Sequence, residues 1–342
     1  MIDIRIRRIG TVVVKHQGLI GLVVVATGAA VFVVSKQATL LEMSSAVRSA
    51  NLWWMIAAIS AELFALWLVA TKHRVIFDRL GHRLSGPFHV RLQLEKTAIG
   101  TISPIGSAPA YYAYARGLQR RGVPIDDILL AVSLNGVAGI VPLLLTVIFA
   151  ALHFSSPSTL LGMPTGLGLV TIVVGFSAIV AGRFHLVQRC FAHMPKQTNH
   201  FFERARGHEI HLRDLALPTT LALLGRLAGI ATLYLCLRAV GQEPSLMTPI
   251  VVTVVGTLAS KLMPIFRGLG VVEAAMAGSL VHVGIPAAPA LGATLLYRLT
   301  SLWLPLILGL LVQLTAATMV WARRAKTGRE VAATPARSAA LR

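Results

Sequence analysis

Residues 256–298 read GTLASKLMPIFRGLGVVEAAMAGSLVHVGIPAAPALGATLLYR, and this stretch decides the fold. An apolar helical run ends at Pro264, a short turn carries Arg267, Gly268 and Gly270, and a second apolar run starts at once. In hydrocarbon every backbone N–H and C=O group needs a partner. A helix interrupted by Pro and Gly is therefore tolerated only where it is buried in protein or lines a cavity. The break predicts a site inside a membrane protein.

Four ionisable residues lie in or beside this break, namely Lys261, Arg267, Glu273 and Arg298. Ionisable groups at membrane depth are costly, so we expect them to have a function. Glu273 is predicted in the first turn of the second half-helix, where its carboxylate complements the positive helix end and can pair with Arg267 or Arg298. A buried ion pair that only fixes the hairpin is the alternative interpretation.

Anion binding is the chemistry that these residues favour. The planar fork of Arg298 matches phosphate oxygens, although it suits the Glu273 carboxylate equally well. The turn itself holds Arg267, and exposed backbone N–H groups around Gly268 and Gly270 could add an anion-binding nest. We therefore expect the turn to contact a phosphate group.

The composition indicates the class of protein independently. Of 342 residues, 55% are hydrophobic and only 13% are charged, and the mean hydropathy is +0.73. Apolar runs this numerous and long exceed what a soluble core uses, so the sequence predicts an all-α polytopic membrane protein. The net charge of +19 comes from basic residues clustered between the apolar runs. That pattern is typical of membrane topology rather than of nucleic-acid binding.

The apolar runs predict about six full spans and two interrupted segments. The spans are expected at 18–34, 51–71, 124–151, 165–182, 215–238 and 286–320. The two interrupted segments, 97–122 and 246–284, are predicted to be re-entrant broken-helix hairpins.

The distribution of Lys and Arg predicts the orientation in a bacterial inner membrane. With the N-terminus inside, 25 Lys and Arg fall on the cytoplasmic side and three fall outside, which favours two cytoplasmic termini. Basic loops are expected at 72–96 and 183–214. Residues 1–320 then form a single multi-pass transmembrane domain, and 321–342 form a basic, disordered cytoplasmic tail.

An internal repeat is predicted between segments 92–152 and 246–320. Each half contains a broken hairpin, a Gly-x-Pro and a long helix with an internal Pro. The corresponding residues are Pro104, Gly122, Pro124 and Pro142 in the first half and Pro264, Gly284, Pro286 and Pro305 in the second. Because the two hairpins would enter from opposite faces, the halves would be inverted, an arrangement by which many transporters place a binding site near the midplane.

The first break, at Pro104 and Gly106, is poorer in charge. Ser107, Tyr111 and Arg116 follow it and are secondary site candidates, although the tyrosines of this segment may equally mark the membrane interface. The alternative to a symmetric pair of sites is therefore an asymmetric site dominated by the second break.

Glu62 and Arg226 are isolated ionisable residues in separate predicted spans. Since a charge facing lipid is costly, we expect both to point into the helix bundle, where they could pair. The eleven histidines lie mostly in predicted loops, and no zinc-protease, Walker A or dinucleotide-binding motif occurs. The sequence therefore predicts no metal, no cofactor and no enzymatic activity.

The second half of the chain resembles a known family. The residues that carry the resemblance, by order and spacing, are Pro264, Gly268, Gly270, Glu273, Gly284, Arg298 and Trp303. They are similar to the second half of the lysylphosphatidylglycerol synthase transmembrane region, also called the flippase-like membrane family. The resemblance extends loosely over residues 15–320, and it implies a membrane protein that handles a lipid, with Glu273 and Arg298 at the family's polar positions.

The first break departs from the family pattern, because Ser107 stands where the family usually carries a Glu. The primary hypothesis is an inner-membrane, flippase-like transporter of an amphipathic lipid headgroup, which could be that of a phospholipid, a polyprenyl phosphate or a hopanoid-type lipid. One alternative is a membrane accessory subunit of a lipid-synthesis enzyme, and another is an intramembrane lipid-modifying enzyme. The expected partners are membrane lipids and no nucleic acid, and a homo-oligomer is left open.

Overall fold

The computed structural model describes residues 48–103, 107–153, 159–160, 163–164, 212–262 and 270–315. These residues form helices joined by turns, and one short antiparallel ladder in which β1 (Thr159–Leu160) pairs with β2 (Met163–Pro164). The predicted spans 18–34 and 165–182, the basic stretch up to residue 211 and the tail 321–342 lie outside the described residues.

Four helices of the described chain are long and apolar enough to cross a membrane: Leu52–Arg79, Ile125–Ala150, Arg213–Ala239 and Ala287–Thr315. Large apolar side chains cover their outer surfaces, and Trp53 on the first of them is 80% exposed. Water would disfavour so much exposed apolar surface, whereas lipid accommodates it. The chain is therefore an all-helical, polytopic membrane protein, as its composition predicts.

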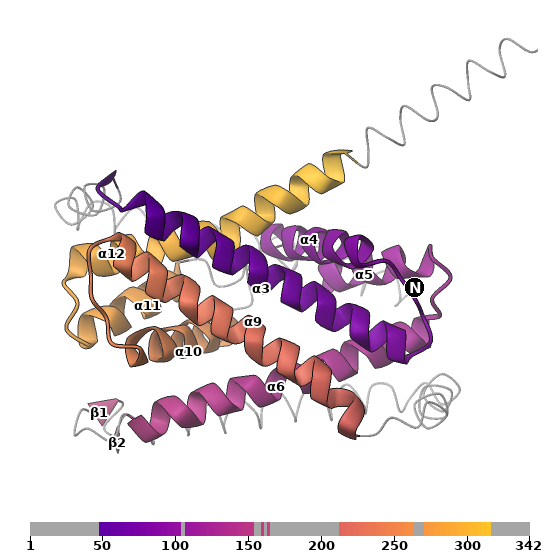
Figure 1. The fold of residues 1–342 in the computed structure, drawn as a ribbon, viewed down its shortest axis with the longest axis horizontal. Helices are drawn as coiled ribbons and strands as arrows, with labels where there is room; N and C mark the ends of the chain where they lie inside the picture. The colour runs from indigo at the N-terminus through magenta and orange to yellow at the C-terminus, as the bar shows by residue number, and fades with distance from the viewer. Residues whose placement is uncertain are drawn as a thin grey trace, which may run out of the picture.

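The helices α3 (Leu52–Arg79) and α9 (Leu212–Ala239) pack against each other in antiparallel directions (Figure 1). At one end, the Asn51 N–H donates to the Ala239 carbonyl at 2.8 Å, and at the other, the Arg79 guanidinium pairs with the Asp214 carboxylate at 2.7 Å. The two helices approach closely midway, where Gly225 lies against Ala65 and Leu68. Small residues permit this close approach in membrane helices.

The helix α3 continues past residue 71 to Arg79, and α4 (Gly86–Ile102) begins soon after. The predicted basic loop 72–96 is therefore wrong for most of its length. Its charged residues support helix formation through pairs one turn apart, Arg74 with Asp78 and Arg91 with Glu95.

The fold contains two helix pairs, and within each pair a short break in the sequence separates the two helices. In the first half, α4 is followed by α5 (Ala108–Gln119), and in the second half, α10 (Met247–Leu262) is followed by α11 (Val271–His282). Within each pair the two helices pack against each other. Figure 1 places α4 and α5 near one end of the long helices and α10 and α11 near the other.

Each pair ends in the same turn and leads into a long helix. Gly122 and Gly284 have φ angles of 82° and 92°, a left-handed conformation that Gly adopts without strain. The next residue, Val123 or Ile285, donates its N–H to the carbonyl five positions earlier, which satisfies the helix end.

The long helices that follow these turns are α6 (Ile125–His153) and α12 (Ala287–Arg298), and α12 continues through the π-helix η2 (Leu299–Trp303) to Thr315. Each reaches the helix pair of the other half. Val147 of α6 packs with Val254 and Leu258 of α10, whereas Gly309 of the last helix lies against Leu94 and Ala98 of α4.

Each helix pair has an apolar core of its own. Phe77, Leu118 and Ile128 are fully buried in the core around α4 and α5, and Leu233 and Met276 are fully buried in the core around α10 and α11. The two cores lie in opposite halves of the fold, and the space between the two helix pairs is available for a site.

Candidate functional site

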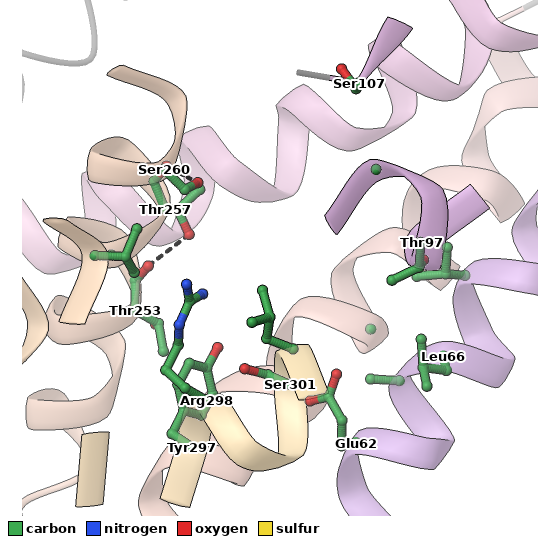
Figure 2. Close-up of a pocket in the computed structure, with 18 of the residues that line it drawn as sticks. Glu62, Leu66, Thr97, Ser107, Thr253, Thr257, Ser260, Tyr297, Arg298 and Ser301 are labelled. Carbon is green, nitrogen blue, oxygen red and sulfur yellow. Dashed lines mark hydrogen bonds between the residues drawn. The ribbon is translucent and has the colours of Figure 1, made fainter. Parts of the chain in front are cut away.

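A cavity of about 630 Å³ lies between the two helix pairs (Figure 2). Helices from both halves line it, and much of its wall is polar. The polar residues of the wall are Glu62, Gln93, Lys96, Thr97, Ser107, Tyr111, Thr253, Thr257, Ser260, Lys261, Tyr297, Arg298 and Ser301.

Arg298, the last residue of α12, is 8% exposed and lines this cavity. Its Nε donates to Oε1 of Glu273 at 2.5 Å, so of the two partners predicted for Glu273 the structure shows Arg298, while Arg267 lies outside the described residues. Its Nη2 is buried and makes no hydrogen bond within the described part of the chain. A buried guanidinium N–H without a partner favours an anionic or acceptor-bearing ligand, because leaving it unpaired is unfavourable.

Glu273 is fixed by the first turn of α11. Its second carboxylate oxygen, Oε2, accepts the Gly270 N–H at 2.6 Å, which is half of a capping box. Gly270 has a φ angle of 86°, at which the backbone of a residue with a side chain would be strained. The turn that presents the Gly270 N–H to the carboxylate therefore requires a Gly. Glu273 does not line the cavity itself, but its carboxylate forms an ion pair with Arg298, which does.

The π-helix η2 follows Arg298 directly. A π-helical turn widens the backbone and is frequent at functional sites. Ser301 and Leu302, both within η2, line the cavity beside Arg298 and Tyr297. The local irregularity therefore helps to form this side of the site.

The first half contributes a second cation, Lys96 of α4. Its Nζ lies 5.4 Å from the ring centre of Tyr111 and 5.0 Å from that of Tyr114, and 3.4 Å from Nε2 of His73. Tyr114 is 3% exposed, so this tyrosine does not mark a membrane interface. Sequence reasoning assigned Lys96 to a loop and missed its place in the cavity.

A periodic signal could have identified this wall. Gln93, Lys96, Thr97 and Gly100 line the cavity from α4 and stand at positions i, i+3, i+4 and i+7, the spacing of one helical face. Positive charge alone predicts a loop at 72–96, whereas this spacing indicates a polar helix face.

The other predicted site residues are distributed over several places. Glu62 is 9% exposed and lines the cavity, so it points into the helix bundle as expected. Ser107, Tyr111 and Lys261 line the cavity too. Lying outside the described residues are Pro104, Gly106, Pro264, Arg267 and Gly268.

Besides Glu273 and Gly270, the predicted candidates Arg226 and Arg116 do not line the cavity. Arg226 of α9 donates from Nε to Thr146 Oγ1 of α6 at 2.7 Å, which ties these two long helices together. Arg116 of α5 lies over the ring of Tyr112, with its Cζ 5.8 Å from the ring centre. Neither residue is placed to contact a ligand in the cavity.

Within the residues that the structure describes, no group of three or more His, Cys, Asp or Glu is arranged to hold a metal ion. Cys236 is a buried free thiol of α9, and Cys190 lies outside the described residues. The polar atoms that face the cavity belong to basic, hydroxyl, amide and single carboxylate groups, which suit the binding of a polar ligand.

Comparison with known protein families identifies a match over most of the chain. The model of the family described as "Lysylphosphatidylglycerol synthase TM region" matches residues 18–309, which include every helix described above except the last turns of the final one. No curated protein matches the chain.

Proposed function

The chain belongs to the family of the lysylphosphatidylglycerol synthase TM region, and from this premise we propose that it is a flippase-like lipid transporter. The lipid headgroup would pass through the cavity while the acyl tails stay in the bilayer. The observation that carries the proposal is Arg298, whose buried Nη2 has no hydrogen-bond partner among the described residues and whose side chain lines the cavity.

The charge of the cavity supports an anionic headgroup. Lys96, Lys261 and Arg298 line it, against the single carboxylate of Glu62. The volume of about 630 Å³ falls in the range of small-molecule sites, so it suits a headgroup rather than a whole lipid. Phospholipids and polyprenyl phosphates carry the phosphate that Arg298 would bind, which favours them over hopanoid-type lipids.

The architecture we propose is six full spans and two re-entrant helix pairs in an inverted repeat. Support comes from the helix bounds. The ends of α3 and α9 differ by 160 residues (79 to 239), and the starts of α6 and α12 differ by 162 (125 to 287). The repeat would thus include α3 and α9 and extend beyond the segments 92–152 and 246–320.

The residues that line the cavity follow the same correspondence. Positions 93, 96, 97 and 100 of α4 line it, and so do positions 253, 256, 257 and 260 of α10, each 160 residues later. A cavity built from equivalent positions in two inverted halves is the expected place for a transporter's binding site. Without Lys96, which lines the cavity, 24 Lys and Arg still fall in the segments assigned to the cytoplasm against three outside, which supports an inner-membrane protein with both termini inside.

The purely structural interpretation of the Glu273–Arg298 pair explains only part of its geometry. A fixing ion pair needs the Nε contact to Glu273, but it gives no role to the Nη2 that lacks a partner. A catalytic Glu273 is less consistent with the structure, because both of its oxygens are already hydrogen-bonded, one to Arg298 and one to Gly270.

The test is a headgroup-accessibility assay in proteoliposomes with labelled phosphatidylglycerol. We expect the wild-type protein to equilibrate the label between leaflets and Arg298→Ala to lose most of this movement, while Arg298→Lys keeps part of it because the positive charge remains. The matched control is Arg238→Ala, since Arg238 pairs with the exposed Glu243 at 2.9 Å and does not line the cavity.

Movement in Arg298→Ala equal to that of the wild-type protein would remove this residue from the mechanism. If no lipid class moves with any variant, transport is wrong and an accessory role becomes the better hypothesis. That role predicts that reversing charges in 183–214 abolishes activity of a partner enzyme while Arg298→Ala leaves it intact.

A further inference from the structure

Three hydroxyl residues on α10 form one wall of the cavity, and each hydroxyl already donates its proton to a backbone carbonyl of the same helix. Thr253 Oγ1 donates to the Pro249 and Ile250 carbonyls at 2.7 and 3.0 Å, Thr257 Oγ1 to the Thr253 carbonyl at 2.7 Å, and Ser260 Oγ to the Thr257 carbonyl at 2.8 Å. A hydroxyl has a single proton and two lone pairs. These three hydroxyls therefore offer hydrogen-bond acceptors to the cavity rather than donors.

The opposite wall, on α4, offers another acceptor. Gln93 donates from Nε2 to Thr97 Oγ1 at 3.5 Å, while its Oε1 is buried and accepts no hydrogen bond from the described residues. Gln93 is 9% exposed and lines the cavity. A buried acceptor without a donor is unfavourable, so it favours a ligand that supplies one.

These acceptors and the cation Arg298 face the same space. Figure 2 shows Thr253, Thr257 and Ser260 on one side, Thr97 on the other, and the Arg298 guanidinium extending towards the hydroxyls. A bare phosphate would satisfy Arg298 and would place its oxygens against the acceptor walls. A headgroup with hydroxyl or ammonium donors beyond the phosphate can satisfy both the Arg298 guanidinium and the acceptors on the cavity walls.

We propose that Thr253, Thr257, Ser260 and Gln93 form an acceptor surface that selects phospholipids whose headgroups carry hydrogen-bond donors beyond the phosphate. The proposal rests on the lipid transport proposed above and names the class of headgroup for that same cavity. The donors could be the hydroxyls of a polyol or the ammonium of an amine, which share this chemistry.

The experiment compares headgroup movement of three lipids in the same proteoliposomes. Phosphatidylglycerol and phosphatidylpropanol have the same net charge and nearly the same size, but only the former has headgroup hydroxyls. Phosphatidylethanolamine supplies the ammonium arm. We expect at least one donor-bearing lipid to move about tenfold faster than phosphatidylpropanol, because hydrogen-bonding sites reject analogues that leave their buried groups unpaired. Which one moves identifies the donor.

The residue test is Thr257→Val, which removes one acceptor oxygen and keeps the shape. We expect the rate ratio of the donor-bearing lipid to phosphatidylpropanol to fall about threefold or more. The control is Thr232→Val, because Thr232 is fully buried on α9, makes the same type of bond, to the Ala228 carbonyl, and does not line the cavity. The ratio is measured within one preparation, so the folded fraction cancels.

The outcomes separate the two proposals. If all three lipids move at the same rate, the acceptor surface is wrong and transport stands. If the ratio in Thr257→Val equals that in Thr232→Val, the assignment to α10 is overturned. If no lipid moves, transport itself fails, and the selectivity fails with it.

Discussion

Arg298 is held on one side and unsatisfied on the other. The Glu273 carboxylate accepts a hydrogen bond from the Arg298 Nε and another from the Gly270 N–H. The arginine is therefore oriented by a turn whose geometry depends on a Gly. The guanidinium therefore needs little reorganisation to bind an anion. Preorganisation of this kind favours binding because the ordering is complete before the ligand arrives.

The role of Glu273 can be tested by stability. Glu273→Ala leaves the buried Arg298 without its carboxylate and removes the acceptor of the Gly270 N–H, so we expect a loss of about 3 kcal/mol or more. Glu273→Gln keeps an uncharged acceptor and should lose less. Thermal unfolding in detergent measures both, with Glu243→Ala as control because Glu243 is exposed in its pair with Arg238. Equal midpoints for Glu273→Ala and Glu243→Ala would contradict this account.

At single residues, the sequence predicted that Glu273 starts a helix and pairs with Arg267 or Arg298, because Glu273 follows Gly270 by three residues and all three candidates are ionisable in apolar sequence. It missed Lys96 and Gln93. A Lys between basic residues is ambiguous, since topology and binding use the same charge, and the cavity that distinguishes them forms only when α4 packs against distant helices.

The elements of this fold depend on close approach between helices. The last helix passes α4 at Gly309, where a Cβ would collide with the Leu94 carbonyl oxygen and would lie 2.7 Å from the Ala98 Cβ. A carbonyl oxygen belongs to the backbone and cannot move aside as a flexible side chain can. This contact joins the end of one half to the helix pair of the other.

Gly309→Ala should therefore separate these two helices. We expect a loss of about 1–3 kcal/mol from overpacking, even though Ala is the better helix former. Gly278→Ala on α11 is the matched control, because nothing lies within 4 Å of a Cβ there, and it should be neutral or stabilising. Unfolding midpoints in detergent decide between them, and equal stability of the two variants would show that the helices are not this close.

Most elements could be predicted from apolar runs and from Pro and Gly. The expected segments 51–71, 124–151, 215–238 and 286–320 coincide with most of each long helix, although α3 extends eight residues further, and 246–284 contains α10 and α11. The error at 72–96 arose because charge was taken as evidence of a loop. In the structure α3 continues and buries Ile76 and Phe77 on one face, while Arg74, Asp78 and Arg79 are exposed and Lys72 is buried.

At the scale of the whole molecule, α3 and α9 run in opposite directions, as the proposed inverted repeat requires. The start of α3 meets the end of α9 and the reverse, and each helix pair receives the long helix of the other half. The sequence suggested the repeat through Pro and Gly alone. It did not include α3 and α9, because their correspondence is one of helix bounds and contacts rather than of residue identity.

The inverted arrangement predicts opposite labelling of equivalent positions. Arg83 and Glu243 are exposed and stand two residues after Gly81 and Gly241, which end α3 and α9. In a Cys190→Ser background, Arg83→Cys should react with an impermeant maleimide only in inside-out vesicles, and Glu243→Cys only in right-side-out cells. The buried Cys236 should stay unlabelled and is the internal control. Labelling of both positions from one face would rule out inversion.

The crossing of α3 and α9 also carries a historical implication. Ala65 and Gly225 face each other there, since a Cβ at Gly225 would lie 3.9 Å from the Ala65 carbonyl oxygen, and each is the other's counterpart 160 positions away. A contact between equivalent positions is the signature of self-association. Two copies of a half-length ancestor, inserted in opposite orientations and joined later by gene fusion, would meet in this way, and a cavity lined by both copies would have existed before the fusion. Fusion would then have freed each half to diverge, leaving Glu273 and Arg298 in one half only.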